Sequence, residues 1–264
     1  MNKKYFQQKQ PICLAALSPA VSSDMNHSPL TTHYSLKQIL AFTLAEVLII
    51  LGIIGIVATL TLSTVINNTQ NKQLETLFKK SSSSLLQISQ RVVLEDYGGQ
   101  IPDNELWTSL EHYAKYLNGT HCVGTSDGGC PANSGTNYCT FMNNNYKDFS
   151  GKVVAGCLGN DYVVNVIDGS TYYFDYANPV EINNFGRQQV VVDINGWKKG
   201  PNKLGHDMFL FQINRDGKIV LGGDVGSCYS KERYCTLNSS SSNNGYGCTI
   251  KAVNEKDYFK NLPH

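Results

Sequence analysis

The chain has 264 residues, of which 41% are hydrophobic and 16% charged, and its formal net charge is +1. This composition suits one or two globular domains, argues against wholesale disorder, and gives no bulk positive charge for direct binding to nucleic acid. The charge is uneven, because four of the 22 basic residues but only one of the 21 acidic residues lie in residues 1–41, which leaves about −2 for the remainder.

A run without any charged residue covers residues 47–66 and holds nothing more polar than Thr and Ser. At about 1.5 Å per residue this run spans about 30 Å, which is the thickness of the hydrocarbon core of a bilayer. It is too long for the apolar core of an ordinary secretory signal. We therefore predict one transmembrane helix, whose lysine-containing N-terminal flank stays in the cytoplasm by the positive-inside rule.

The residues directly before this run, from Ala41 to Glu46, read Ala-Phe-Thr-Leu-Ala-Glu. This arrangement resembles the N-terminal segment of the prepilin family, which comprises the type IV pilins and the pseudopilins of type II secretion. The resemblance implies that a prepilin peptidase cuts between Ala41 and Phe42 and methylates Phe42 as the new first residue. Glu46 then becomes the fifth-position acid. Ala41 stands where the family usually has Gly.

The charge on Glu46 needs a partner, because a carboxylate inside a membrane helix is costly unless it is paired. Cleavage would supply an ammonium group on Phe42. In a low dielectric, its pairing with Glu46 of a neighbouring subunit would set the axial offset between the protomers of a filament. The alternative is that Glu46 reaches the lipid headgroups in an ordinary signal anchor.

The resemblance also implies a location and partners. Residues 1–41 would be the leader, and translation from Met25 would make residues 1–24 an artefact of start-site choice. The mature protein would cross the bacterial inner membrane once, with its N-terminus in the cytoplasm and its head in the periplasm or outside the cell. Its partners would be the prepilin peptidase, the inner-membrane assembly platform with its ATPase, and other pilin or pseudopilin subunits.

A second helical pattern covers residues 67–97 and continues the transmembrane segment of residues 42–66. Apolar residues recur at steps of three and four, and most charged residues fall on the other face. The four serines of residues 81–84 could form a flexible linker, but the period passes through them, so we expect a helix with a close packing contact there. Gly98 and Gly99 are predicted to end the helix. The apolar positions are Leu74, Leu77, Phe78, Leu85, Ile88 and Val92.

Residues 98–264 are predicted to form a globular head. A short helix is expected at residues 105–117, and an Asp168-Gly169 turn predicts a β-hairpin. The predicted strands are residues 161–167, 170–176, 188–194, 207–213 and 218–221. The fold class is therefore α+β and pilin-like, with a long N-terminal helix, half transmembrane and half amphipathic, packed on an antiparallel sheet with disulfide-stapled loops.

The loop between the third and fourth of these strands carries oxygen-bearing side chains at Asp193, Asn195 and Asp207. Oxygen ligands from Asp and Asn beside a Gly turn are what a hard cation such as Ca²⁺ requires. The loop resembles the Asp-x-Asn-Gly beginnings of calcium loops and the calcium loop of major pseudopilins. The alternative is an Asx-turn loop, in which Asp193 and Asn195 accept hydrogen bonds from backbone amides.

The cysteines contain no Cys-x-x-Cys pair, which zinc ribbons and fingers need to place two thiolates on one ion. Disulfides in an oxidising compartment are the better interpretation. Because the candidates are odd in number, one is expected to be free or joined to another chain, and Cys228 with Cys235 is one predicted bridge. The candidates are Cys122, Cys130, Cys139, Cys157, Cys228, Cys235 and Cys248.

Three function classes follow from these patterns. A structural pilus or pseudopilus subunit accounts for the leader, Glu46, the long helix and the cysteines together. A minor tip pilin that binds a surface, DNA or a secreted substrate through its long loops is the alternative. We do not expect an enzyme, because the Gly-x-Ser-x-Gly match at residues 124–128 lies in a loop between cysteines and lacks the strand and helix that this motif needs.

Overall fold

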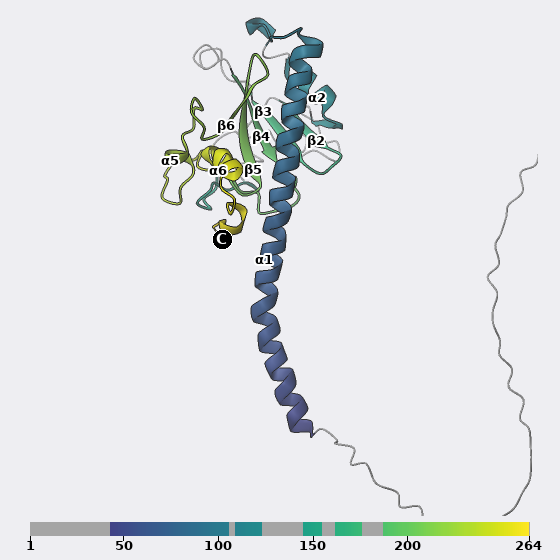
Figure 1. The fold of residues 1–264 in the computed structure, drawn as a ribbon, viewed down its shortest axis with the longest axis vertical. Helices are drawn as coiled ribbons and strands as arrows, with labels where there is room; N and C mark the ends of the chain where they lie inside the picture. Colours follow the sequence, from purple (N-terminus) through teal and green to yellow (C-terminus); the bar gives the residue numbers. More distant parts are fainter. Residues whose placement is uncertain (1–42, 106–108, 123–144, 155–161, 176–186, 264) are drawn as a thin grey trace, which may run out of the picture. The chain divides into compact units, whose positions relative to one another are not determined.

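The computed structural model describes residues 43–105, 109–122, 145–154, 162–175 and 187–263. The predicted α+β class is confirmed: a long N-terminal helix is followed by an antiparallel sheet (Figure 1). The chain divides into two units between Leu51 and Gly52, inside this helix, and all packing described below lies within the second unit.

The N-terminal helix, α1, runs from Leu44 to Arg91 and continues through one π-helical turn, Val92–Asp96. The predicted helix through the four serines to Asp96 is thus confirmed. Its end follows from Gly98 and Gly99, whose φ angles of 67° and 128° lie in the left-handed region that favours glycine.

The sheet has six strands, and each strand pairs antiparallel with the next in the chain. The predicted hairpin is confirmed, with β2 and β3 joined by the Asp168-Gly169 turn. The first strand, β1, was not predicted. The strands are β1 (Gly119–Cys122), β2 (Tyr162–Val166), β3 (Thr171–Asp175), β4 (Arg187–Asp193), β5 (Met208–Asn214) and β6 (Ile219–Leu221).

Alternate side chains of the sheet enter two hydrophobic cores, one on each face. On the face covered by α1, the ring of Phe78 lies 4.5 Å from that of Phe209 and 6.3 Å from that of Phe211. On the opposite face, Tyr173 and Leu210 pack in the second core. Burial on both faces explains the continuous apolar runs at residues 190–192 in β4 and 208–211 in β5.

Short helices complete the head around the sheet. The predicted helix of residues 105–117 is found as a 3₁₀ turn and a helix separated by residues outside the described range. These elements are η2 (Asp103–Glu105), α2 (Ser109–Tyr116), α5 (Lys231–Tyr234), η3 (Tyr246–Cys248), α6 (Thr249–Asn254) and η4 (Phe259–Asn261).

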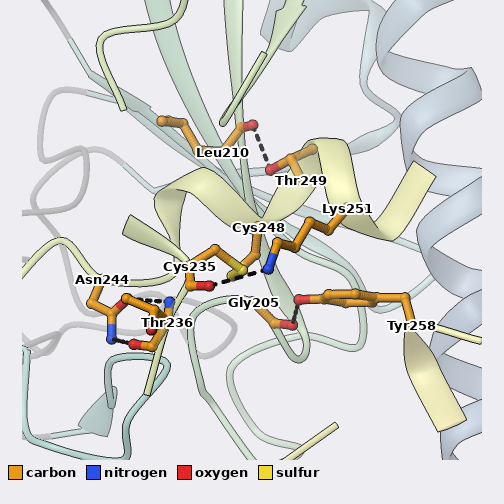
Figure 2. The surroundings of a disulfide bond; sticks show 9 residues. All are labelled: Gly205, Leu210, Cys235, Thr236, Asn244, Cys248, Thr249, Lys251 and Tyr258. Atoms are coloured by element: carbon orange, nitrogen blue, oxygen red, sulfur yellow. Dashed lines mark hydrogen bonds between the residues drawn. A yellow bond between two sulfur atoms is a disulfide. The ribbon is translucent and has the colours of Figure 1, made fainter. Parts of the chain in front are cut away.

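The C-terminal segment is fastened to the sheet around the Cys235–Cys248 disulfide, whose Cα atoms lie 4.9 Å apart (Figure 2). Next to it, the Thr249 hydroxyl donates to the carbonyl of Leu210 in β5 at 2.8 Å. Both cysteines are buried. The disulfide therefore ties η3 to the end of α5, and the hydrogen bond ties α6 to β5.

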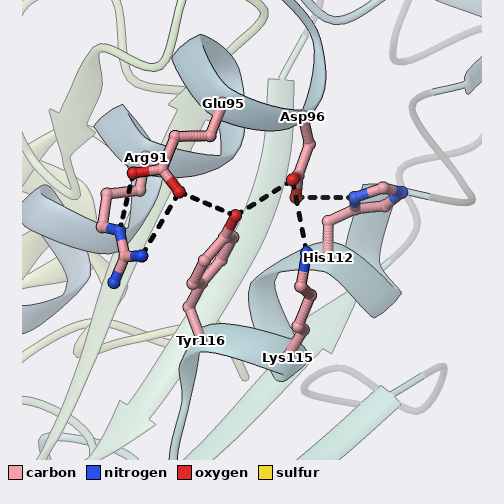
Figure 3. Close-up of polar contacts among 6 residues, drawn as sticks. All are labelled: Arg91, Glu95, Asp96, His112, Lys115 and Tyr116. Carbon is pink, nitrogen blue, oxygen red and sulfur yellow. Dashed lines mark hydrogen bonds and ion pairs between the residues drawn. The ribbon is translucent and has the colours of Figure 1, made fainter.

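At its far end, α1 is joined to α2 by a polar cluster (Figure 3). Asp96 lies 2.7 Å from His112 Nδ1 and 2.9 Å from the Tyr116 hydroxyl, and it pairs with Lys115 at 3.4 Å. Burial alone would raise the pKa of Asp96, but these three partners outweigh it, and the pKa is lowered. The cluster therefore holds its carboxylate charged and fixes the helix end to the head.

Candidate assembly segment and acidic loop

Thr43 and Glu46 close the first turn of α1. The backbone N–H of Thr43 donates to Glu46 Oε2 at 2.8 Å, and its hydroxyl donates to the same oxygen at 2.9 Å. In return, the N–H of Glu46 donates to Thr43 Oγ1 at 3.2 Å. This reciprocal pair is a capping box, whose sequence signature is Thr-x-x-Glu before an apolar run. This capping-box signature is visible in the sequence, but the sequence-based prediction treated Glu46 only as a charge inside the membrane.

The apolar side chains that follow are exposed along the helix, for example Leu48 at 60% and Ile54 at 57%. Within the described residues, α1 is the one helix long and apolar enough to cross a membrane by length and composition. The predicted cleavage and methylation residues, Ala41 and Phe42, lie outside the described residues, so the cut between them stays a prediction.

The acidic loop places two predicted site residues, Asp193 and Asp207, at one end of the sheet. Asp193 ends β4, and Asp207 directly precedes β5, so the antiparallel pairing of these strands brings them together. The N–H of Ile194 donates to the Asp207 carbonyl at 2.9 Å, and both aspartates are fully buried.

Each of these carboxylates accepts hydrogen bonds inside the head. Asp193 accepts from the N–H of Gly196 at 2.9 Å and from the Tyr146 hydroxyl at 3.1 Å. The Tyr146 hydroxyl also lies 2.7 Å from that of Tyr173. These two tyrosines were missed by sequence reasoning, because Tyr146 is 47 residues away from Asp193 and no local pattern links them.

Asp207 is held by the loop itself. The N–H of Asn202 donates to one carboxylate oxygen at 2.8 Å, and the N–H of Lys203 donates to the other at 2.7 Å. The amide donor on Asp193 is what the Asx-turn interpretation predicts, whereas Asp207 was not part of that interpretation and Asn195 Oδ1 accepts no hydrogen bond within the described residues.

Burial raises the pKa of both carboxyl groups. It raises the pKa of Asp207 to about 7, against the opposing hydrogen bonds from backbone amides and the Asn195 side chain. It raises the pKa of Asp193 well above its ordinary value, and the nearby Asp207 adds to this rise by charge repulsion. Two carboxyl groups in one buried place thus disfavour each other's charged forms.

A cation would relieve that repulsion, and the loop holds two further oxygens that are not used in hydrogen bonds among the described residues. The Oδ1 atoms of Asn195 and Asn202 are buried and have no hydrogen-bond partner within the described residues. Their amide nitrogens instead bond the loop, with Asn195 Nδ2 donating to Gly200 O and Asn202 Nδ2 donating to Trp197 O, both at 3.0 Å. Asn202 was not among the predicted ligands.

The donor set is therefore two carboxylates and two amide oxygens, which suits Ca²⁺. Within the described residues, no three His, Cys, Asp or Glu side chains cluster to hold a metal. Calcium binding by Asp193, Asn195 and Asp207 stays a prediction.

The cysteines give one correction. The predicted bridge between Cys228 and Cys235 is wrong, because Cys235 pairs with Cys248, which the η3 turn brings against it. Cys228 is a free thiol, and its Sγ lies 3.5 Å from Gln212 Nε2. Of the remaining candidates, Cys122 ends β1. Cys130, Cys139 and Cys157 lie outside the described residues.

Comparison of the chain with protein-family models, with curated proteins and with solved structures gives no match. The architecture, a long apolar N-terminal helix followed by an antiparallel sheet, is consistent with a pilin-like fold.

Proposed function

We propose that this chain is a structural, non-enzymatic subunit of a type IV pilus or a type II secretion pseudopilus, and that it polymerises through its N-terminal helix. The observation that carries the proposal is the division of α1 into two halves. The first half is apolar and exposed, and an apolar stripe of the second half is buried against the sheet. Glu46 is the one charged residue between Leu44 and Asn71.

The capping box is compatible with a role for Glu46 in assembly. Cleavage after Ala41 keeps both Thr43 and Glu46, and it creates an ammonium group on Phe42, one residue before the helix cap. In a single subunit, the carboxylate stays with its own Thr43. In a filament, the same carboxylate accepts the ammonium group of a neighbouring subunit, which is favourable in a low dielectric.

The Cys235–Cys248 disulfide supports a head on the oxidising side of the membrane. We propose that the chain crosses the bacterial inner membrane once, with its N-terminus in the cytoplasm. The partners are the prepilin peptidase, an assembly platform with its ATPase, and sister subunits.

The experiment that tests this function is intact-mass and N-terminal analysis of the membrane-extracted protein. In cells with an active prepilin peptidase, we expect a chain that lacks residues 1–41 and begins at N-methylated Phe42. In matched cells with an inactive peptidase, we expect the uncut chain. A leader that is retained in both hosts would leave an ordinary signal-anchored protein and remove the basis for a filament.

A further inference from the structure

A groove of about 700 Å³ lies between α1, just after its apolar half, and the loops of the head. The helix supplies polar amides, among them Asn67, Gln70 and Gln73. The head supplies loops that include residues 199–206 and the chain end at Pro263. Every residue of this groove lies in the second unit and within the described residues.

The charge of the groove is positive, since its lining includes Lys147, Lys199 and Lys203 and no Asp or Glu. None of the three lysines forms an ion pair with a carboxylate among the described residues. Lys203 Nζ donates only to a carbonyl, that of Pro263, at 3.3 Å. The groove therefore offers ammonium groups to an anion from outside.

The nearest acids attract Lys203, but each is held by other donors among the described residues. Asp148 is buried and accepts hydrogen bonds from the Ser150 hydroxyl and the N–H of Lys152. Asp207 is held by backbone amides, as described above. Burial first, and then the charge of Lys147, lower the pKa of Lys203 despite the attraction of both acids. Positive charge is thus crowded where Lys147 and Lys203 pair in a β-bridge.

The position of the groove along α1 indicates which kind of anion it can bind. Asn67 directly follows the apolar run and Leu77 lies ten residues further, so the helix wall of the groove extends from about 1.5 Å to about 16 Å beyond the end of that run. The headgroup layer on each side of a bilayer is about 5–8 Å thick. With the apolar run in the hydrocarbon core, as the proposed function has it, the part of the groove nearest to that run, at Asn67, Gln70 and Asn71, lies at the depth of the lipid phosphates.

We propose that this groove binds the phosphate headgroup of an anionic membrane phospholipid, through Lys147, Lys199 and Lys203. The proposal rests on the membrane anchoring that is part of the proposed function. Bound lipid would fix the head against the membrane surface while the subunit waits for assembly, and it would have to be released when the subunit leaves the bilayer.

The test uses the full chain in nanodiscs of phosphatidylcholine with added phosphatidylglycerol, in EDTA to remove divalent cations. Native mass spectrometry of the released protein counts the phosphatidylglycerol molecules that it retains as their fraction is raised. We expect the triple variant Lys147→Gln, Lys199→Gln, Lys203→Gln to need on the order of 100-fold more anionic lipid, since one lysine near a membrane surface contributes about five-fold.

The matched control changes three exposed lysines outside the groove, Lys218→Gln, Lys231→Gln and Lys256→Gln, and should retain lipid like the wild type. Equal retention by both triple variants would overturn the proposal. So would normal lipid retention combined with failed filament assembly in the groove variant, which would make the groove a contact between subunits.

Two further outcomes separate the sources of failure. Inorganic phosphate that binds the lipid-free protein in detergent with the same lysine dependence, while phosphatidylglycerol is not retained, would assign the groove to a soluble anion and overturn the lipid proposal alone. A chain that does not enter the nanodisc at all would overturn the membrane anchor of the proposed function. Insertion is scored first, by co-elution with the disc.

Discussion

The two halves of α1 have the same backbone and opposite surroundings. From residue 47 to 62 the side chains are mostly apolar and all exposed, whereas from Leu74 to Val93 an apolar stripe is buried against the sheet. Leu85 is fully buried, and Ile54 is 57% exposed. The helical backbone therefore does not depend on these surroundings. The spacing of the apolar residues decides whether a part of the helix packs against the head or faces an external apolar medium such as a bilayer.

The largest effect should come from placing a charge in each half. Leu85→Asp would bury a carboxylate against the sheet, and we expect it to lower the free energy of unfolding of the head by on the order of 4 kcal/mol or more. Ile54→Asp should leave that free energy unchanged and instead cost membrane insertion about 3 kcal/mol. Denaturant titration in detergent and membrane fractionation measure the two effects. An equal loss of head stability in both variants would mean that the first half also packs on the head.

The disulfide gives the next largest effect. Replacing Cys235 and Cys248 together by Ser opens a loop with a sequence separation of 13, and we expect a loss of about 3 kcal/mol in unfolding free energy. Cys228→Ser, which removes a free thiol, should change it by less than about 0.5 kcal/mol. Thermal melts under oxidising conditions compare these variants. A large loss on replacing Cys228 would show that its thiol is needed.

The helix and strand boundaries could be predicted because local patterns set them. The period of α1, the Asp168-Gly169 turn and the apolar runs of β4 and β5 are all visible in the sequence. Strand β1 was missed, because Gly-Thr-His-Cys has no alternation of apolar residues and owes its conformation to pairing with β2, as in Gly119 with Val166.

The candidate site was less predictable, because its contacts join distant segments. The two residues at the ends of the acidic loop, Asp193 and Asp207, could be found from residue type and spacing. Tyr146 could not, since only tertiary packing brings it to Asp193. The disulfide partner of Cys235 likewise could not be predicted, because it depends on tertiary packing that places the η3 turn, with Cys248, next to Cys235. The cationic groove joins α1 to loops more than 70 residues later, so no local pattern indicates it.

The buried aspartates should make the stability of the head depend on pH, in contrast to the apolar half of α1, which contains no titrating group after Glu46. A folded pKa of about 7 for Asp207 lies above its ordinary value of 3.8. Its stabilising contribution is therefore complete below pH 3.8 and is lost as the pH rises through 7. In EDTA, we expect the titration of Asp207 alone to lower the free energy of unfolding of the head by about 2 kcal/mol between pH 5.5 and pH 8.

Two variations sharpen this prediction. Asp207→Asn should flatten the pH dependence, while Asp216→Asn, an exposed control beside Lys218, should leave it intact. Millimolar calcium at pH 8 should raise the melting temperature of the wild type, since the cation replaces the proton between the two carboxylates. No calcium shift at pH 8 would remove the calcium interpretation and leave the Asx-turn loop.

The smallest effect on stability, about 1 kcal/mol, is expected at the exposed start of α1, where the capping and assembly roles of Glu46 can be separated. Thr43→Ala removes the cap and keeps the carboxylate, so amide exchange in the first turn should rise about five-fold while filaments still form. Glu46→Gln keeps a capping-box residue and removes the charge, so exchange should change little while assembly is lost. If Thr43→Ala abolished assembly as fully as Glu46→Gln, the cap itself would be the functional element, and the intermolecular ion pair would lose its support.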